Sequence, residues 1–210
     1  MFYVKERQEV LRFGDVLQGY LLSTPVIPEP IVEKPLYDCH IDVGLPKYTV
    51  VMDPCCKTKH KMISLSPLIE IWGTFFQNPY FAEDLTRINR EMGPQEAVSP
   101  QQWESFPEEE KQRRLREGRV YAFENLFIYE PHPLLPKYKV PRREGDIETN
   151  YYMLDFRNTY KLRCDKINSP TDAPLESKIL QLSIDARSEL RNKISTYYGK
   201  PPLEDKISED

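Results

Sequence analysis

Four residues with soft metal ligands lie close together in the first third of the chain: Cys39, Cys55, Cys56 and His60. Zinc binds thiolate and imidazole groups, and a structural zinc site needs four of them in a tetrahedral arrangement. Two strand-like runs, 37–43 and 48–53, predict a hairpin that would bring Cys39 opposite the cysteine pair. The spacing matches no recognised zinc finger, so we favour buried, unreactive cysteines. We accordingly predict no metal, with zinc at these four residues as the competing hypothesis.

The cysteine pair could also supply a nucleophile. Positive charge just downstream, at Lys57 and His60, would favour the thiolate that nucleophilic catalysis requires. No third residue can be assigned to orient a base, and the three histidines form no Ser-His-Asp arrangement. The chain has only 8 glycines and no glycine-rich loop before a predicted helix, so the common phosphate-binding motifs are absent. We therefore predict a solvated loop at these cysteines and no cofactor.

A basic stretch near residue 140 interleaves cations with a tyrosine. Its cationic members are Lys137, Lys139, Arg142 and Arg143, and Tyr138 lies between the lysines. Cations beside an aromatic ring can hold single-stranded nucleic acid, because the bases stack while the phosphates pair with charge. A solvated basic loop has the same composition and is the interpretation that we favour. RNA binding at these four cations remains the alternative.

Hydrophobic periodicity and capping signals predict the elements that would position these residues. Besides the hairpin, apolar alternation predicts strands at 16–22, 62–66, 120–129 and 147–156. Cap and stop residues predict helices at 79–92, at 107–117 and after Ser183. Together the patterns predict an α+β fold, with a helical insertion at 76–118 and a C-terminal helix. We expect one domain at residues 1–199 and an acidic, solvated tail at 200–210.

The predicted helix at 107–117 is nearly all charge. Its acidic residues lie in the first turn and its arginines toward the end, which complements the helix dipole without any ligand. An aromatic turn with Trp103 and Phe106 comes directly before it. We predict that these two aromatics, with Arg113 and Arg114 of the helix, form a surface that binds another protein.

Composition limits the remaining possibilities. The 210 residues are 40% hydrophobic and 11% aromatic, which is typical of a folded chain with many strands. A net charge of −4 provides no global field for a phosphate backbone, so nucleic-acid binding would need a local patch. The N-terminus lacks the apolar run of a signal peptide, and no segment reaches the length of a membrane span. We expect a cytoplasmic protein with reduced thiols that does not enter membranes.

Two segments resemble the opening of the MazF/PemK-like toxins. They are Phe13-Gly-Asp-Val16 and Leu45-Pro-Lys-Tyr-Thr-Val-Val-Met-Asp53, which match a Gly-Asp-Val/Ile strand and a later apolar strand of that family. The resemblance implies a small, strongly curved SH3-like barrel, usually dimeric, whose founding members cut single-stranded RNA without metal. They use an arginine and a Thr or Ser. The arginine position falls near Leu45 or Pro46, where Lys47 is the nearest cation and cannot reproduce a planar guanidinium.

These observations favour a noncatalytic function. We predict a small antiparallel SH3-like barrel or a strongly bent sheet that serves as a regulatory or accessory protein-binding module. The resemblance suggests a bacterial toxin-antitoxin, stress-response or antiviral defence system. The alternative is a metal-independent endoribonuclease of the MazF-like class, with Lys47, Thr49 and Ser64 at its site. The expected partner is another protein, with RNA and a second copy of the chain as further possibilities.

Overall fold

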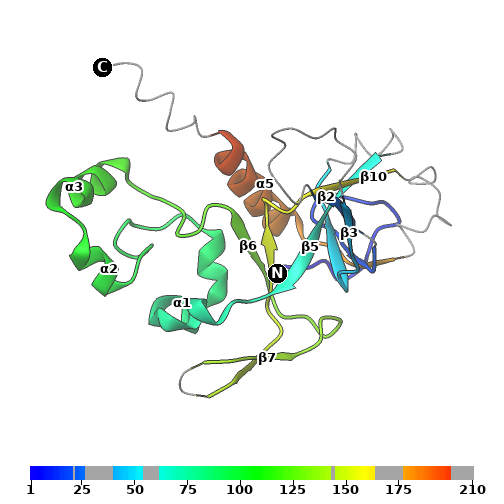
Figure 1. Ribbon diagram of the computed structural model, residues 1–210, viewed down its shortest axis with the longest axis horizontal. Coiled ribbons are helices and arrows are strands. Elements are labelled where there is room, and N and C mark those ends of the chain that lie inside the picture. The colour runs from blue at the N-terminus through cyan, green and yellow to red at the C-terminus, as the bar shows by residue number, and fades with distance from the viewer. Residues whose placement is uncertain (21, 27–39, 54–61, 143–144, 164–176, 200–210) are drawn as a thin grey trace. The chain divides into compact units, whose positions relative to one another are not determined.

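The computed structural model describes residues 1–20, 22–26, 40–53, 62–142, 145–163 and 177–199 (Figure 1). The chain divides into two units, each of which is described by itself. Unit 1 comprises Tyr3–Ile69 and Arg157–Ser183 together with Met1, and unit 2 comprises Glu70–Phe156 and Ile184–Asp210 together with Phe2. The predicted tail at 200–210 lies outside the described residues.

Unit 1 is built on an antiparallel sheet. Its strands are β1 (Val16–Gln18), β4 (Tyr48–Val51), β5 (Met62–Glu70), β10 (Tyr160–Arg163) and β11 (Lys178–Leu180). They follow the order β11-β1-β4-β5, and β10 also pairs with β5. All four residues of β4 are buried, so this strand is an apolar run without alternation. The sheet therefore brings the two chain segments of unit 1 together.

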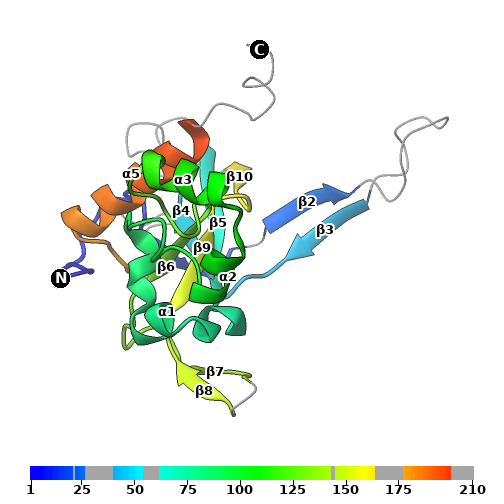
Figure 2. The ribbon, with the colours of Figure 1, turned by 90° about the vertical axis from the view of Figure 1, so that its left-hand side faces the viewer.

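A long hairpin carries the N-terminal half of this sheet. Strands β1 and β4 pair with Val16 opposite Val50, and the same register continues into β2 (Leu22–Val26) and β3 (His40–Gly44), where Leu22 lies opposite Gly44. Between the two pairs, the Gly19 N–H donates to the Lys47 carbonyl at 2.9 Å. Figure 2 shows β2 and β3 side by side as a two-stranded ribbon.

The predicted hairpin between 37–43 and 48–53 is therefore wrong. Strand β3 pairs with β2, and β4 pairs with β1 and β5. The physical reason is burial: β4 needs a neighbour along both edges, whereas Ile41 and Val43 of β3 remain exposed. Both strands were identified near their correct positions, but their partners were not, because alternation indicates a strand and not its neighbour.

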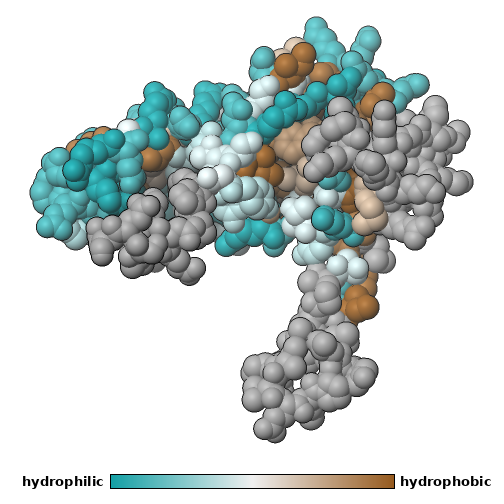
Figure 3. Space-filling view, turned by 90° about the horizontal axis from the view of Figure 1, so that it is seen from above, coloured by the Kyte–Doolittle hydropathy of each residue, from teal (hydrophilic) through white to brown (hydrophobic). Residues whose placement is uncertain are grey.

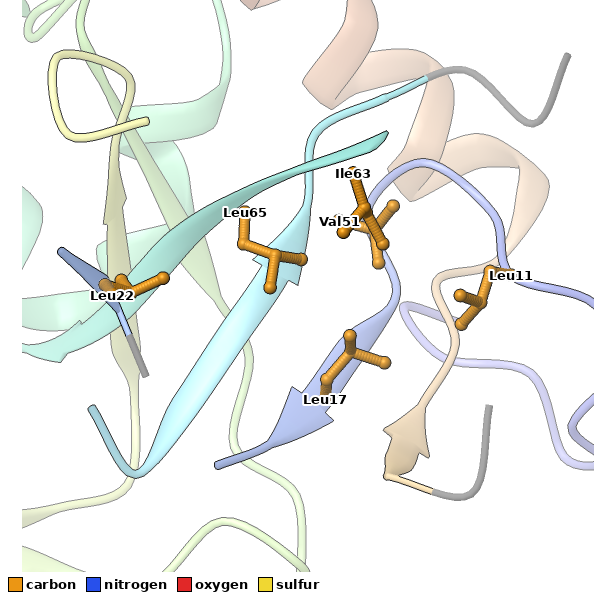
Figure 4. Close-up of a cluster of buried hydrophobic side chains, with 6 residues drawn as sticks. All are labelled: Leu11, Leu17, Leu22, Val51, Ile63 and Leu65. Carbon is orange, nitrogen blue, oxygen red and sulfur yellow. The ribbon is translucent and has the colours of Figure 1, made fainter. Parts of the chain in front are cut away.

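A cluster of aliphatic side chains forms the core of unit 1 (Figure 4). Its members come from the sheet and from the segments that lead into it: Leu11, Leu17, Leu22, Val51, Ile63 and Leu65. Tyr20, Tyr160 and Leu162 pack against the cluster from its rim. None of the sheets in the described part of the chain closes into a barrel, so the α+β class is confirmed while the SH3-like barrel is not.

Unit 2 combines two strand pairs with short helices. Its elements are β6 (Leu126–Tyr129), β9 (Tyr152–Asp155), β7 (Tyr138–Val140), β8 (Ile147–Thr149), the α-helices α1 (Pro79–Glu83), α2 (Pro100–Ser105), α3 (Glu108–Glu117) and α5 (Ile184–Gly199), and the 3-10 helices η2 (Gly73–Gln77) and η3 (Leu85–Asn89). Strands β6 and β9 form four residue pairs, and all four residues of each strand are buried. Phe2, Phe127 and Tyr129 pack together with ring centroids 5.7 to 6.2 Å apart.

The predicted continuous helix at 79–92 is broken at Asp84. The backbone there is extended, and the Asp84 carboxylate accepts from the N–H of Thr86 at 2.9 Å and from its hydroxyl at 2.7 Å. In η3, the buried Asn89 amide pairs with both backbone groups of Ile128, at 2.7 and 2.8 Å. The apolar positions used for the prediction are all buried: Phe81, Leu85, Ile88 and Met92. Local capping and this amide pairing outweigh the helical periodicity.

Candidate functional site

Helices α2 and α3 form a segment, residues 99–118, that we call the α2–α3 segment. It begins with a capping box, in which Ser99 and Gln102 exchange side-chain and backbone hydrogen bonds, and Pro100 occupies the first helical position. It ends at Gly118, whose positive φ of 75° suits glycine and stops α3. The sequence signals for this segment are local. The structure confirms the helix predicted at 107–117, which begins one residue later, at Glu108, and ends at Glu117.

Neither helix of the α2–α3 segment has a buried residue. Isolated helices as short as α3 are marginal in water, because one turn of helix costs more backbone freedom than its hydrogen bond returns. In α3 ion pairs along the helix reduce this cost by a small amount. Glu110 accepts from Arg113 at 2.8 Å and from Arg114 at 2.7 Å, and Arg113 also pairs with Glu117 at 2.5 Å. Hydrogen bonds from Arg113 and then Arg114 lower the pKa of Glu110 to about 2.

Three of the four predicted partner-binding residues come together on this segment. Trp103 and Phe106 meet edge to face with centroids 6.2 Å apart, and the Arg114 guanidinium lies 4.4 Å from the Phe106 ring centroid. Arg113 lies apart from them, held between Glu110 and Glu117. In Figure 3 the surface over α2 and α3, at the left, is mostly hydrophilic with small hydrophobic patches. Aromatic and arginine side chains surrounded by charge are typical of the anchoring residues of protein interfaces.

Leu115 is an exposed residue of the same segment and was missed by sequence reasoning. It is 45% exposed, although it is the one aliphatic side chain in α3. Its signal was present in the sequence, since a lone leucine among ten otherwise polar helical residues has no internal apolar partner. A single exposed leucine is normal on a protein surface, so Leu115 supports a partner site only together with the aromatic pair Trp103 and Phe106.

The residues of the basic stretch at 137–143 have different surroundings, and RNA binding by them stays a prediction. Lys137 pairs with Glu148 at 3.1 Å, and Lys139 lies opposite the same Glu148 in the β7–β8 register. Tyr138 points elsewhere: its hydroxyl donates to the Tyr151 carbonyl and accepts from the Ile71 N–H at 2.7 Å. Burial raises the pKa of Tyr138.

The two arginines of the stretch are Arg142 and Arg143. Arg142 lies near Phe76, with 5.9 Å from its guanidinium carbon to the ring centroid. Arg143 lies outside the described residues. The described cations therefore separate into two lysines near Glu148 and a single arginine beside an aromatic ring.

The residues of the ribonuclease alternative have three different environments. Lys47 is exposed, with its ammonium 5.5 Å from the Tyr48 ring centroid. Thr49 is fully buried, and its hydroxyl has no hydrogen-bond partner among the described residues. Ser64 is buried and bonded to Asp53 through its N–H at 2.5 Å and its hydroxyl at 3.1 Å. Thr49 and Ser64 are therefore buried within the sheet, and the three side chains do not share one exposed surface.

The candidate zinc ligands Cys39, Cys55, Cys56 and His60 all lie outside the described residues, so the zinc hypothesis stays untested. Elsewhere in the described chain, no three His, Cys, Asp or Glu side chains gather in a way that could hold a metal ion.

Comparisons with protein-family models, with curated proteins and with solved structures all return no match. Among the helices that the structure describes, none has both the length and the apolar character needed to cross a membrane.

Proposed function

We propose that this chain is a noncatalytic regulatory or accessory module that binds another protein through the α2–α3 segment. One observation carries the proposal: two short helices have no buried residue, yet they carry the exposed Leu115 and an aromatic pair, Trp103 and Phe106, that is only half-buried. Docking against a partner would bury these side chains and supply the packing on which most helices depend. Trp103 would be the central anchor, with the paired charges of α3 as the rim.

The biological setting rests on the resemblance to MazF/PemK-like toxins at 13–16 and 45–53. It supports a role in a bacterial toxin-antitoxin, stress-response or defence system. The SH3-like barrel rests on the same resemblance. The endoribonuclease alternative has less support, because Thr49 is buried and Ser64 is bonded to Asp53. Incubating the protein with mixed-sequence RNA, with and without chelator, tests it: cleavage that is lost in Lys47→Ala would favour the enzyme.

The protein-binding proposal is tested by measuring affinity for the proteins encoded beside this chain, using calorimetry on purified components. The decisive variant is Trp103→Ala combined with Leu115→Ala, since neither side chain is buried and the fold should persist. We expect Kd to rise at least about tenfold, which corresponds to a loss of about 1.4 kcal/mol. Lys47→Ala, an exposed change in unit 1, is the matched control and should leave Kd unchanged.

Hydrogen exchange gives a second measurement on the same complex. Amides of α3 should exchange more slowly in the complex than in the free protein, because docking removes the fraying of an unsupported helix. A partner that binds the double variant as tightly as the natural chain, with no added protection in α3, would rule out this surface.

A further inference from the structure

A hollow of about 930 Å³ lies in unit 2, between η2 and the end of β7. Its walls include Gly73, Thr74, Phe76 and Gln77 on one side and Pro141 and Arg142 on the other. Its volume is in the range of small-molecule sites, which are typically apolar pockets with a few placed polar groups. We call it the Phe76–Arg142 hollow.

The local sequence builds this hollow from a close approach of two backbones. A Cβ at Gly73 would lie 2.7 Å from the Pro141 carbonyl oxygen, so only glycine lets the two walls come this near. Within η2, Phe75 points into the core, edge to face with Phe123 at 4.8 Å, and the next residue, Phe76, is half-buried at the hollow. The adjacent aromatics thus divide into one that anchors the wall and one that lines the hollow.

The polar groups of the hollow have a definite chemistry. Arg142 is exposed, and its contact with the Phe76 ring, at 5.9 Å, is at the outer limit for a cation–π interaction. Among the described residues, no carboxylate pairs with this guanidinium. Thr74 and Gln77 are exposed at the same wall and provide a hydroxyl and an amide. The hollow therefore offers an aromatic ring, a planar cation and two hydrogen-bonding groups.

We propose that the Phe76–Arg142 hollow binds a nucleotide. Phe76 would stack on the base, because every base has a flat π-face and such stacking tolerates any sequence. Arg142 would hold the phosphate, whose oxygens match the guanidinium fork. Thr74 and Gln77 would hydrogen-bond the edge of the base, as side chains do when they bind unstacked bases. The nucleotide is either a free mononucleotide or one unit of single-stranded RNA, and this site is independent of the proposed protein-binding surface.

The test titrates the full chain with uridine and adenosine monophosphates by calorimetry, and with a labelled short oligouridylate by fluorescence anisotropy. Arg142→Gln and Phe76→Leu should each raise Kd about tenfold, the effect of one lost stacking or charged contact. Arg116→Gln removes the same charge from α3, away from the hollow, and should change Kd less than about twofold. Thermal melting of each variant establishes that it is folded.

The possible results either identify the source of the nucleotide, a strand or a free mononucleotide, or overturn the site. Oligouridylate binding that is much tighter than mononucleotide binding identifies a strand as the ligand, and equal affinities identify a free nucleotide; both support the proposal. Unchanged affinity in Arg142→Gln and Phe76→Leu overturns it. An equal loss in Arg116→Gln would show unspecific charge attraction, and competition by inorganic phosphate as strong as by the mononucleotide would show that no base is bound. Either result also overturns the proposal.

Discussion

The Lys178 ammonium lies 2.7 Å from the Asp15 carboxylate, and both side chains are almost completely buried in unit 1. The same ammonium donates to the Gln8 and Val10 carbonyls, at 3.0 and 2.8 Å, and to the Gln181 side chain at 2.7 Å. One lysine thus connects the N-terminal loop, the start of β1 and the end of β11. A buried cation with this many acceptors is satisfied, so it can remain charged inside the fold.

Replacing Lys178 with methionine should lower the free energy of unfolding by about 3 to 5 kcal/mol, because Asp15 would then be a buried charge without its cation. Urea denaturation followed by circular dichroism measures the change. Lys161→Met, at an exposed lysine of β10, should shift the free energy by no more than about 0.5 kcal/mol. A Lys178 variant as stable as this control would show that the ion pair contributes little.

Lys193 is the second buried lysine among the described residues, and its surroundings differ from those of Lys178. It is fully buried, donates to the Ile88 carbonyl and lies 4.9 Å from the Tyr121 ring centroid. Burial lowers the pKa of Lys193 to about 7, and the nearby Glu124 raises it only in part. The fold therefore favours the neutral amine over the charged form, whereas an ordinary lysine becomes mostly neutral only above pH 10.5.

We expect the stability of the protein to depend on pH through Lys193. Between its folded pKa of about 7 and its unfolded value of 10.5, the unfolded chain binds the extra proton, so stability rises with pH across this window and is flat below it. Lys193→Met removes the titration. The difference in unfolding free energy between variant and natural chain, measured by urea denaturation at pH 6.5 and pH 9.5, should therefore favour the variant more at the lower pH. An equal difference at both pH values would contradict the shifted pKa.

Tyr138→Phe should destabilise unit 2 by about 1 to 3 kcal/mol. The change removes a hydroxyl that bridges the Tyr151 carbonyl and the Ile71 N–H, and both backbone groups would lose this partner where water is largely excluded. Hydrogen exchange at the Ile71 amide should accelerate. Tyr80→Phe is the matched control, because its ring contacts Phe81 at 5.4 Å and its hydroxyl forms no hydrogen bond among the described residues. Equal effects of the two variants would show that the hydrogen bonds of the Tyr138 hydroxyl add no stability of their own.

Gly73→Ala should cost about 1 to 3 kcal/mol, because its Cβ would collide with the Pro141 carbonyl and force the walls of the hollow apart. Gly93→Ala is the control: its Cβ would lie 3.3 Å from the end of the flexible Glu96 side chain, which can move. We expect that substitution to be neutral or slightly stabilising, because alanine has less freedom than glycine in the unfolded chain. Melting temperatures of the two variants that fall together would argue against the close approach.

Features that depend on residues close together in the chain were determined by the sequence alone. The helix at 108–117 follows from its charges and from Gly118, and periodicity identified Phe81, Leu85 and Ile88 as core residues. The aromatic turn at Trp103 and Phe106 was found in the same way, since all these signals lie within a few residues of the feature that they predict.

Only the tertiary structure decided which distant segments meet. It paired β3 with β2, buried Thr49 and Lys193, bridged Lys178 to Asp15, and brought Gly73 against Pro141. Strand alternation specifies a buried face but not the neighbouring strand. The local sequence around a lysine does not indicate that the folded chain will bury it. These contacts form between residues far apart in the chain, where the packing of the whole unit decides the lowest free energy.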